Sequence, residues 1–133
     1  MKNRDKKKVL VVENDEKVLA AFQSRLKDGG FDTRATWSGR EALSVLESQR
    51  FDLLLTDGYL PDLHVSEFLK RVAHLRSRAK IVVMQSPLPK PSVTRRYQGL
   101  GAYAVMDKRD QAAVCRTVAA CCGDRSQELV RKE

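Results

Sequence analysis

Acidic side chains close several short apolar segments of the sequence. Glu13 closes the first segment, Asp57 the third and Asp107 the fifth, and Lys108 follows Asp107. Carboxylates that share a crevice repel one another, and a divalent cation removes that cost. Mg²⁺ takes one or two carboxylates together with phosphate oxygens, and a lysine beside them can pair with a phosphate. These residue types indicate phosphoryl transfer, with Asp57 as the nucleophile and an aspartyl phosphate as its product.

Each of these residues also has an ordinary structural explanation. Asn14 and its acidic neighbours Glu13 and Asp15 can cap a following helix. Asp57 can be a turn residue before a glycine, and Lys108 can be one more surface lysine. Any one explanation is sufficient alone, but together they leave unexplained why all these groups end strands.

Two other kinds of site are not favoured. A nucleotide or flavin site would need a glycine-rich loop after the first strand, whereas "ENDEK" (13–17) offers acids that repel phosphate unless a metal ion lies between them. His64 and His74 suggest no Ser-His-Asp arrangement and are interpreted as surface residues.

The elements that position these residues alternate along the chain. Apolar segments typical of strands alternate with segments of helical periodicity, and the strands are expected at 8–13, 32–37, 51–57, 80–85 and 102–107. This alternation predicts an α/β fold, a doubly wound five-stranded parallel sheet covered by helices on both faces. In such a sheet the ligand site lies outside the carboxyl ends of the strands, which is where the acids are.

The length and composition bound the remaining possibilities. The chain has 133 residues, 42% hydrophobic and 32% charged, which suits one globular domain. We expect a basic, disordered leader at 1–7, the domain at 8–122 and a polar tail at 123–133. No apolar run approaches the roughly 20 residues of a membrane span, and the charged start is not a signal peptide, so a cytoplasmic protein without membrane insertion is expected.

The charge balance raises the question of an anionic partner. The formal net charge is +8, and cations concentrate in the leader, in 70–80 and in 90–96. Such a surface can attract nucleic acid, acidic proteins or anionic membrane. No aromatic residues are interleaved with the cations and no DNA-binding motif is visible, so nucleic acid is not expected as a partner. The three cysteines, an odd number, indicate neither a disulfide framework nor a metal site.

Three segments together resemble the receiver domain of bacterial response regulators. They are "VLVVEN" (9–14), "DLLLTDGYLPDL" (52–63) and "GLGAYAVMDK" (99–108), and the resemblance spans about residues 8–122. It implies a flavodoxin-like (βα)5 sheet in the order 2-1-3-4-5. It also implies a signalling receiver rather than an enzyme. In two-component signalling, such a receiver takes a phosphoryl group from a sensor histidine kinase or a phosphotransfer protein.

The resemblance also assigns roles to individual residues. Asp57 is at the position of the phosphoacceptor, and Lys108 is at that of the lysine that contacts the phosphoryl group. Glu13 and Asn14 are at the acidic pair that holds Mg²⁺, and the backbone carbonyl of Tyr59 would be a further ligand.

The chain departs from the family pattern at one magnesium position and at the residues that relay phosphorylation. Asn14 replaces a carboxylate and should weaken Mg²⁺ binding. Gln85 replaces the Ser or Thr that senses phosphate, Val105 replaces an aromatic residue, and Arg109 replaces the proline after the lysine. Two functions therefore stay open. One is a phosphoaccepting receiver, and the other is a receiver-like interaction module that acts without phosphate through the face of helix four, strand five and helix five.

Overall fold

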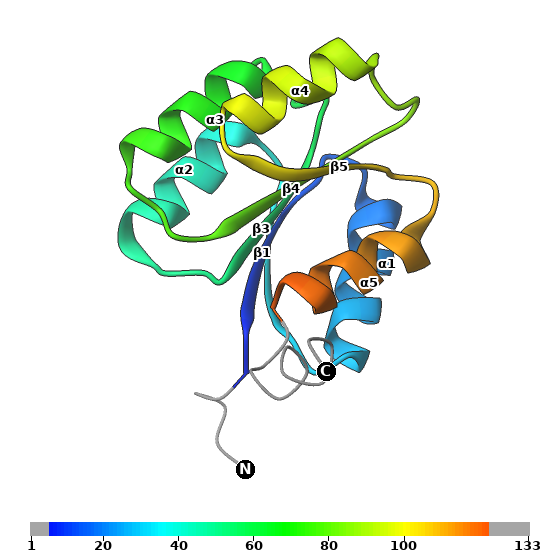
Figure 1. The fold of residues 1–133 in the computed structure, drawn as a ribbon. Coiled ribbons are helices and arrows are strands. Elements are labelled where there is room, and N and C mark those ends of the chain that lie inside the picture. Colours follow the sequence, from blue (N-terminus) through cyan, green and yellow to red (C-terminus); the bar gives the residue numbers. More distant parts are fainter. Residues whose placement is uncertain (1–5, 123–133) are drawn as a thin grey trace, which may run out of the picture.

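The structure, a computed structural model, describes residues 6–122, in which five strands alternate with five helices (Figure 1). The expected tail at 123–133 and residues 1–5 of the expected leader lie outside the described residues. The elements are β1 Lys8–Val12, α1 Glu16–Asp28, β2 Asp32–Thr36, α2 Gly39–Ser48, β3 Leu53–Asp57, α3 Val65–His74, β4 Lys80–Gln85, α4 Pro91–Gly99, β5 Ala102–Asp107 and α5 Gln111–Cys121.

The five strands form one parallel sheet in the order β2-β1-β3-β4-β5, which confirms the predicted fold class and strand order. The strand β2, whose residues are largely polar and in part exposed, lies at one edge of the sheet. β3 lies in the middle and is buried at all five positions, so it has no polar face. A central strand covered on both faces is the expected location of a continuous apolar run.

Side chains alternate between two core layers because successive residues of a strand point to opposite faces. In β1, Leu10 and Val12 face α2, α3 and α4, whereas Val9 and Val11 face α1 and α5. Figure 1 shows the same division, with α2, α3 and α4 on one side of the sheet and α1 and α5 on the other. The helices thus fix the strands from both sides and hold their carboxyl ends at one edge.

Local signals set the helix starts. The Ser38 side chain caps α2 by accepting a hydrogen bond from the Glu41 N–H, and the Glu41 carboxylate accepts one from the N–H of Trp37, the residue before the cap. The strands expected at 8–13 and 32–37 end one residue earlier than expected, and the strand expected at 51–57 begins two residues later, because local patterns give their weakest signal at element ends. None of the helices within residues 6–122 combines the length and the apolar character that crossing a membrane requires.

Candidate functional site

Glu13, Asp57 and Lys108 meet at the carboxyl edge of the sheet, and we refer to these three residues as the rim site. Asp57 is the last residue of β3, Glu13 follows β1 and Lys108 follows β5. The Lys108 Nζ lies 2.9 Å from Asp57 Oδ2 and 2.9 Å from Glu13 Oε1. Because β4 separates β5 from β3, the long lysine side chain reaches across a strand end to make both contacts.

The rim site is shielded from water. The side chains of Glu13 and Asp57 are 1% and 7% exposed, and that of Lys108 is 21% exposed. Burial raises the pKa of Glu13, and hydrogen bonds from the Asp15 N–H and from Lys108 offset this only in part. Burial lowers the pKa of Lys108, but hydrogen bonds to Asp57 and Glu13 outweigh it, so that the pKa is raised overall. The two carboxylates therefore hold the lysine in its ammonium form.

The carboxylates of the rim site fit a magnesium ion. Glu13 Oε1 is buried and receives no aligned hydrogen bond, although the Lys108 ammonium is close to it. Asp57 Oδ1 accepts the Tyr59 N–H at 3.0 Å, and Oδ2 faces Lys108. No third carboxylate, histidine or cysteine joins them anywhere in residues 6–122. Two carboxylates are enough, because Mg²⁺ commonly keeps several waters and phosphate oxygens.

Three other polar residues at the strand ends are not part of the rim site. Asp15 accepts hydrogen bonds from N–H groups of the first turn of α1, so the capping explanation holds for it. Asn14 is exposed, and its side chain makes no hydrogen bond to any residue in the described range. Asp107 pairs with Arg109, whose Nη2 lies 2.8 Å from Asp107 Oδ2. This guanidinium lowers the pKa of Asp107 to about 2.

Gln85, at the position of the phosphate-sensing hydroxyl, faces Tyr59. The Gln85 side-chain amide donates to the Tyr59 hydroxyl at 3.3 Å, while its buried Oε1 has no hydrogen-bond partner. Gly58 makes room for this amide, because a Cβ at residue 58 would overlap Gln85 Oε1. Sequence reasoning missed this contact. The only signal for it is a glycine directly after Asp57, beside the end of β4.

The loop between β3 and α3 is fixed by two contacts. Tyr59 forms an isolated antiparallel bridge with His64, and the His64 side chain caps α3. Asp62 accepts the N–H groups of Gly39 and Arg40 at 3.0 and 2.9 Å. Burial raises the pKa of Asp62, but these two hydrogen bonds outweigh it and lower the pKa overall. No local pattern could have predicted the Asp62 contact, because it joins residues more than twenty positions apart.

The chain is similar to known proteins of one family. The family model "Response regulator receiver domain" matches residues 9–119. The polar-differentiation response regulator DivK of Brucella anthropi is 32% identical over 100 residues, which cover 73% of this chain and 81% of DivK. The alkaline phosphatase synthesis transcriptional regulatory protein PhoP of Bacillus subtilis is 31% identical over 78 residues, or 59% of this chain. The matched residues make up 32% of the length of PhoP.

Solved structures agree on the fold. The signal receiver domain of the putative LuxO repressor protein from Vibrio parahaemolyticus has a TM-score of 0.83 at 18% identity, covering 96% of this chain and 98% of that one. A CheY-like response regulator receiver domain protein from Methanospirillum hungatei has a TM-score of 0.82 at 22% identity, covering 93% and 99%. The family match and the DivK identity confirm the resemblance found in the sequence, and the chain belongs to the response regulator receiver domain family.

Proposed function

We propose that the chain is a cytoplasmic phosphoaccepting receiver, in which Asp57 takes a phosphoryl group from a sensor histidine kinase or a phosphotransfer protein. Membership of the family makes it a signalling domain of two-component systems. The observation that carries the finer proposal is the Lys108 ammonium, which lies 2.9 Å from both Asp57 and Glu13. A carboxylate beside a fixed cation, at the carboxyl edge of a parallel sheet, is suited to phosphoryl transfer.

The proposed reaction uses the side chains already in contact. An Asp57 Oδ attacks the phosphorus of the donor, an O–P bond forms, and the P–N bond to the donor histidine breaks with its electron pair. The leaving imidazole takes up a proton. Lys108 then holds a phosphoryl oxygen as a point charge, in the way it holds Asp57 Oδ2 at 2.9 Å.

Magnesium completes this proposal. Glu13 and Asp57 would hold the ion, with the Asn14 side-chain oxygen and the Tyr59 backbone carbonyl as further ligands. When bound, Mg²⁺ supplies positive charge that offsets the charge of the phosphoryl oxygens. Glu13 Oε1 supports this assignment, because this buried carboxylate oxygen accepts no aligned hydrogen bond within residues 6–122, although the Lys108 ammonium lies 2.9 Å from it.

Mass spectrometry of the intact protein tests the proposal. After incubation with Mg²⁺ and acetyl phosphate, we expect the chain to gain the mass of one phosphoryl group, and Asp57→Asn to gain none. Asp107→Asn is the matched control, since Asp107 also ends a strand but pairs with Arg109. It should be phosphorylated as the unaltered chain is. No gain at any Mg²⁺ concentration, or an undiminished gain in Asp57→Asn, would overturn the assignment.

A second candidate function rests on Gln85. By resemblance to the family, Gln85 is at the position of a hydroxyl residue, and its side-chain amide donates a hydrogen bond to the Tyr59 hydroxyl. A ligand shifts a conformational equilibrium only through its differential affinity for the two states. Phosphorylation without a sensing hydroxyl would leave the face of α4, β5 and α5 unchanged. The chain would then be an interaction module, using the exposed Tyr103 and the exposed cations of this face, which are Lys90, Arg95, Arg96 and Arg109.

Magnesium titration separates the two candidates without using phosphorylation. For the receiver, calorimetry should detect Mg²⁺ binding, and Asn14→Asp should tighten it because a carboxylate is added beside Glu13. Asp15→Asn is the matched comparison, since Asp15 is occupied as the cap of α1. No Mg²⁺ binding in either protein would favour the interaction module. Equal or weaker affinity in Asn14→Asp would instead count against Asn14 as a magnesium ligand.

A further inference from the structure

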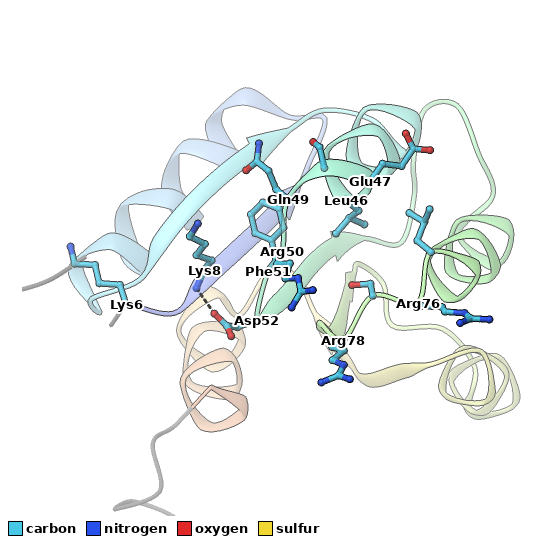
Figure 2. Close-up of a pocket in the computed structure, with 13 residues that line it drawn as sticks. Lys6, Lys8, Leu46, Glu47, Gln49, Arg50, Phe51, Asp52, Arg76 and Arg78 are labelled. Carbon is cyan, nitrogen blue, oxygen red and sulfur yellow. Dashed lines mark hydrogen bonds between the residues drawn. The ribbon is translucent and has the colours of Figure 1, made fainter. Parts of the chain in front are cut away.

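A groove at the amino-terminal end of the sheet takes no part in the proposed chemistry. It has a volume of about 740 Å³, and it lies where β1 and β3 begin and where α2 and α3 end (Figure 2). β3 has five residues, and at about 3.3 Å per residue it places the groove about 16 Å from the rim site. The groove is therefore a separate surface at the opposite end of the strands.

The groove gathers cations from three segments that are distant in the sequence. Five cationic side chains line it, against the two carboxylates of Glu47 and Asp52, and the five are Lys6, Lys8, Arg50, Arg76 and Arg78. None of the five forms an ion pair with another residue of the described range. Asp52 is already engaged, because its Oδ2 accepts the Lys8 backbone N–H at 2.8 Å. The groove thus presents an excess of unpaired positive charge.

Helix ends explain only part of this excess. Cations are favoured near the carboxyl end of a helix, which suits Arg50 after α2 and Arg76 after α3. However, Arg76 has φ 56°, in the left-handed region where glycine usually follows a helix. An arginine at this position is strained, so the backbone conformation does not explain the residue. Lys8 and Arg78 lie near strand starts and gain nothing from a helix end.

The groove also offers hydrogen-bond acceptors. The last carbonyl groups of a helix have no intrahelical partner and project beyond its end. At the end of α2, the Gln49 N–H donates a hydrogen bond to the Val45 carbonyl. Within residues 6–122, no hydrogen bond reaches the next three carbonyls, those of Leu46, Glu47 and Ser48. A ligand that suits this groove therefore carries negative charge for the cations and N–H donors for the helix end.

We propose that the groove binds an acidic, extended peptide segment of a partner protein. Such a segment brings carboxylates for the arginines and lysines, and its backbone N–H groups can reach the free carbonyls at the end of α2. A nucleic-acid backbone brings phosphate acceptors but no N–H donors. The one aromatic residue that lines the groove, Phe51, is buried and offers no platform on which bases could stack.

The chain's own terminal sequence is a poor candidate for this segment. After Cys122 the sequence has three acidic residues, Asp124, Glu128 and Glu133, and three basic ones, Arg125, Arg131 and Lys132. These side chains bring no net negative charge to the groove. The charge complementarity therefore favours a second protein.

Fluorescence polarisation with a labelled peptide of alternating glutamate and alanine tests this proposal. We expect the unaltered chain to bind this peptide and not its glutamine counterpart. The double variant Arg50→Gln and Arg78→Gln should bind it at least about tenfold more weakly, since two charge-assisted contacts are lost. The matched control Arg95→Gln and Arg96→Gln removes the same charge from exposed positions on α4, and it should lose less than about twofold.

Several results would overturn the proposal. One is no binding of the acidic peptide at millimolar concentration. Another is an equal loss in the groove variant and the α4 variant, which would mean general charge attraction. A third is tighter binding of an oligonucleotide or of anionic vesicles that the groove variant alone abolishes, which would assign the groove to phosphate. Asp57→Asn should bind the peptide normally, so failure of the phosphoryl-transfer proposal leaves this test unaffected.

Discussion

The rim site and the groove lie at opposite ends of the same strands and carry charge in opposite ways. At the rim, two carboxylates and one ammonium are buried together in direct contact. At the groove, five cations remain in water with no ion-pair partner among the described residues. Burial makes the difference, because a charge taken out of water needs a partner, whereas an exposed charge is solvated.

Because of this difference, we expect the rim-site charges to affect the stability of the fold and the groove cations to affect the binding of a partner. Each charge of the rim site compensates the others, so we expect the loss of one to destabilise the fold. The groove cations compensate nothing within the described chain, so their removal should leave the fold intact and affect only an anionic partner. The following predictions test this contrast, from the largest expected effect to the smallest.

Removing the rim cation should have the largest effect. Lys108→Met leaves the Glu13 and Asp57 carboxylates buried without their counter-ion, and we expect the free energy of unfolding to fall by about 3 kcal/mol. Chemical denaturation measures this change. Adding Glu13→Gln to the variant removes one of the two uncompensated charges and should recover part of the loss. A fall below about 1 kcal/mol would mean that the rim charges are solvated.

Filling the space beside the rim should be the next most damaging change. In Gly58→Ala the new Cβ would overlap Gln85 Oε1, and we expect a loss of about 2 kcal/mol in the free energy of unfolding. Gln85→Ser shortens the obstructing side chain, so the double variant Gly58→Ala and Gln85→Ser should regain part of the free energy of unfolding that Gly58→Ala loses. Gly99→Ala is the control, since a Cβ there meets nothing within 4 Å. If the double variant were no more stable than Gly58→Ala, the overlap would not be the cause.

How far the sequence predicts this molecule depends on the range of the contacts. Apolar segments of strand length and segments of helical periodicity are local patterns, so the five strands and their alternation with helices could be predicted from them. The meeting of Glu13, Asp57 and Lys108 also followed, because the carboxyl ends of parallel strands share one edge of the sheet.

Other contacts could not be predicted because they depend on the direction of a side chain. Asp15 and Asp107 also lie at strand ends, but one caps α1 and the other pairs with Arg109. The strand pattern is the same for these acids and for Asp57, and only the turn after each strand decides where the carboxylate points. The groove depends in the same way on how segments 6–8, 50–52 and 76–78 come together in the fold.

A substitution in the groove should raise stability rather than lower it. Arg76→Gly places a residue that tolerates φ 56° at this position, and we expect a gain of about 0.5 kcal/mol, because relief of the strain exceeds the extra entropy of an unfolded glycine. Arg78→Gly is the control and should lose stability, since Arg76 is the one non-glycine residue with positive φ in the described range. Denaturation midpoints measure both. A loss in Arg76→Gly would show that its guanidinium supports the fold.

The Asp107–Arg109 pair should give the smallest effect, because it lies at the edge of the rim but in water. Its guanidinium lowers the pKa of Asp107 from 3.8 to about 2. A lowered carboxyl pKa adds stability that is present above about pH 4 and is lost as the pH falls through 2. NMR titration of the Asp107 carboxyl should give a midpoint near 2 in the unaltered chain.

In Arg109→Gln the midpoint should return toward 3.8, and the stability should fall less steeply between pH 4 and pH 2. Arg116→Gln on α5 removes the same charge from another exposed position and should leave the midpoint unchanged. Because water screens an exposed pair, the change in stability should be far smaller than that of Lys108→Met. A midpoint near 3.8 in both the unaltered chain and Arg109→Gln would mean that the pair is open in solution. Asp107 would then be free to turn toward the rim site.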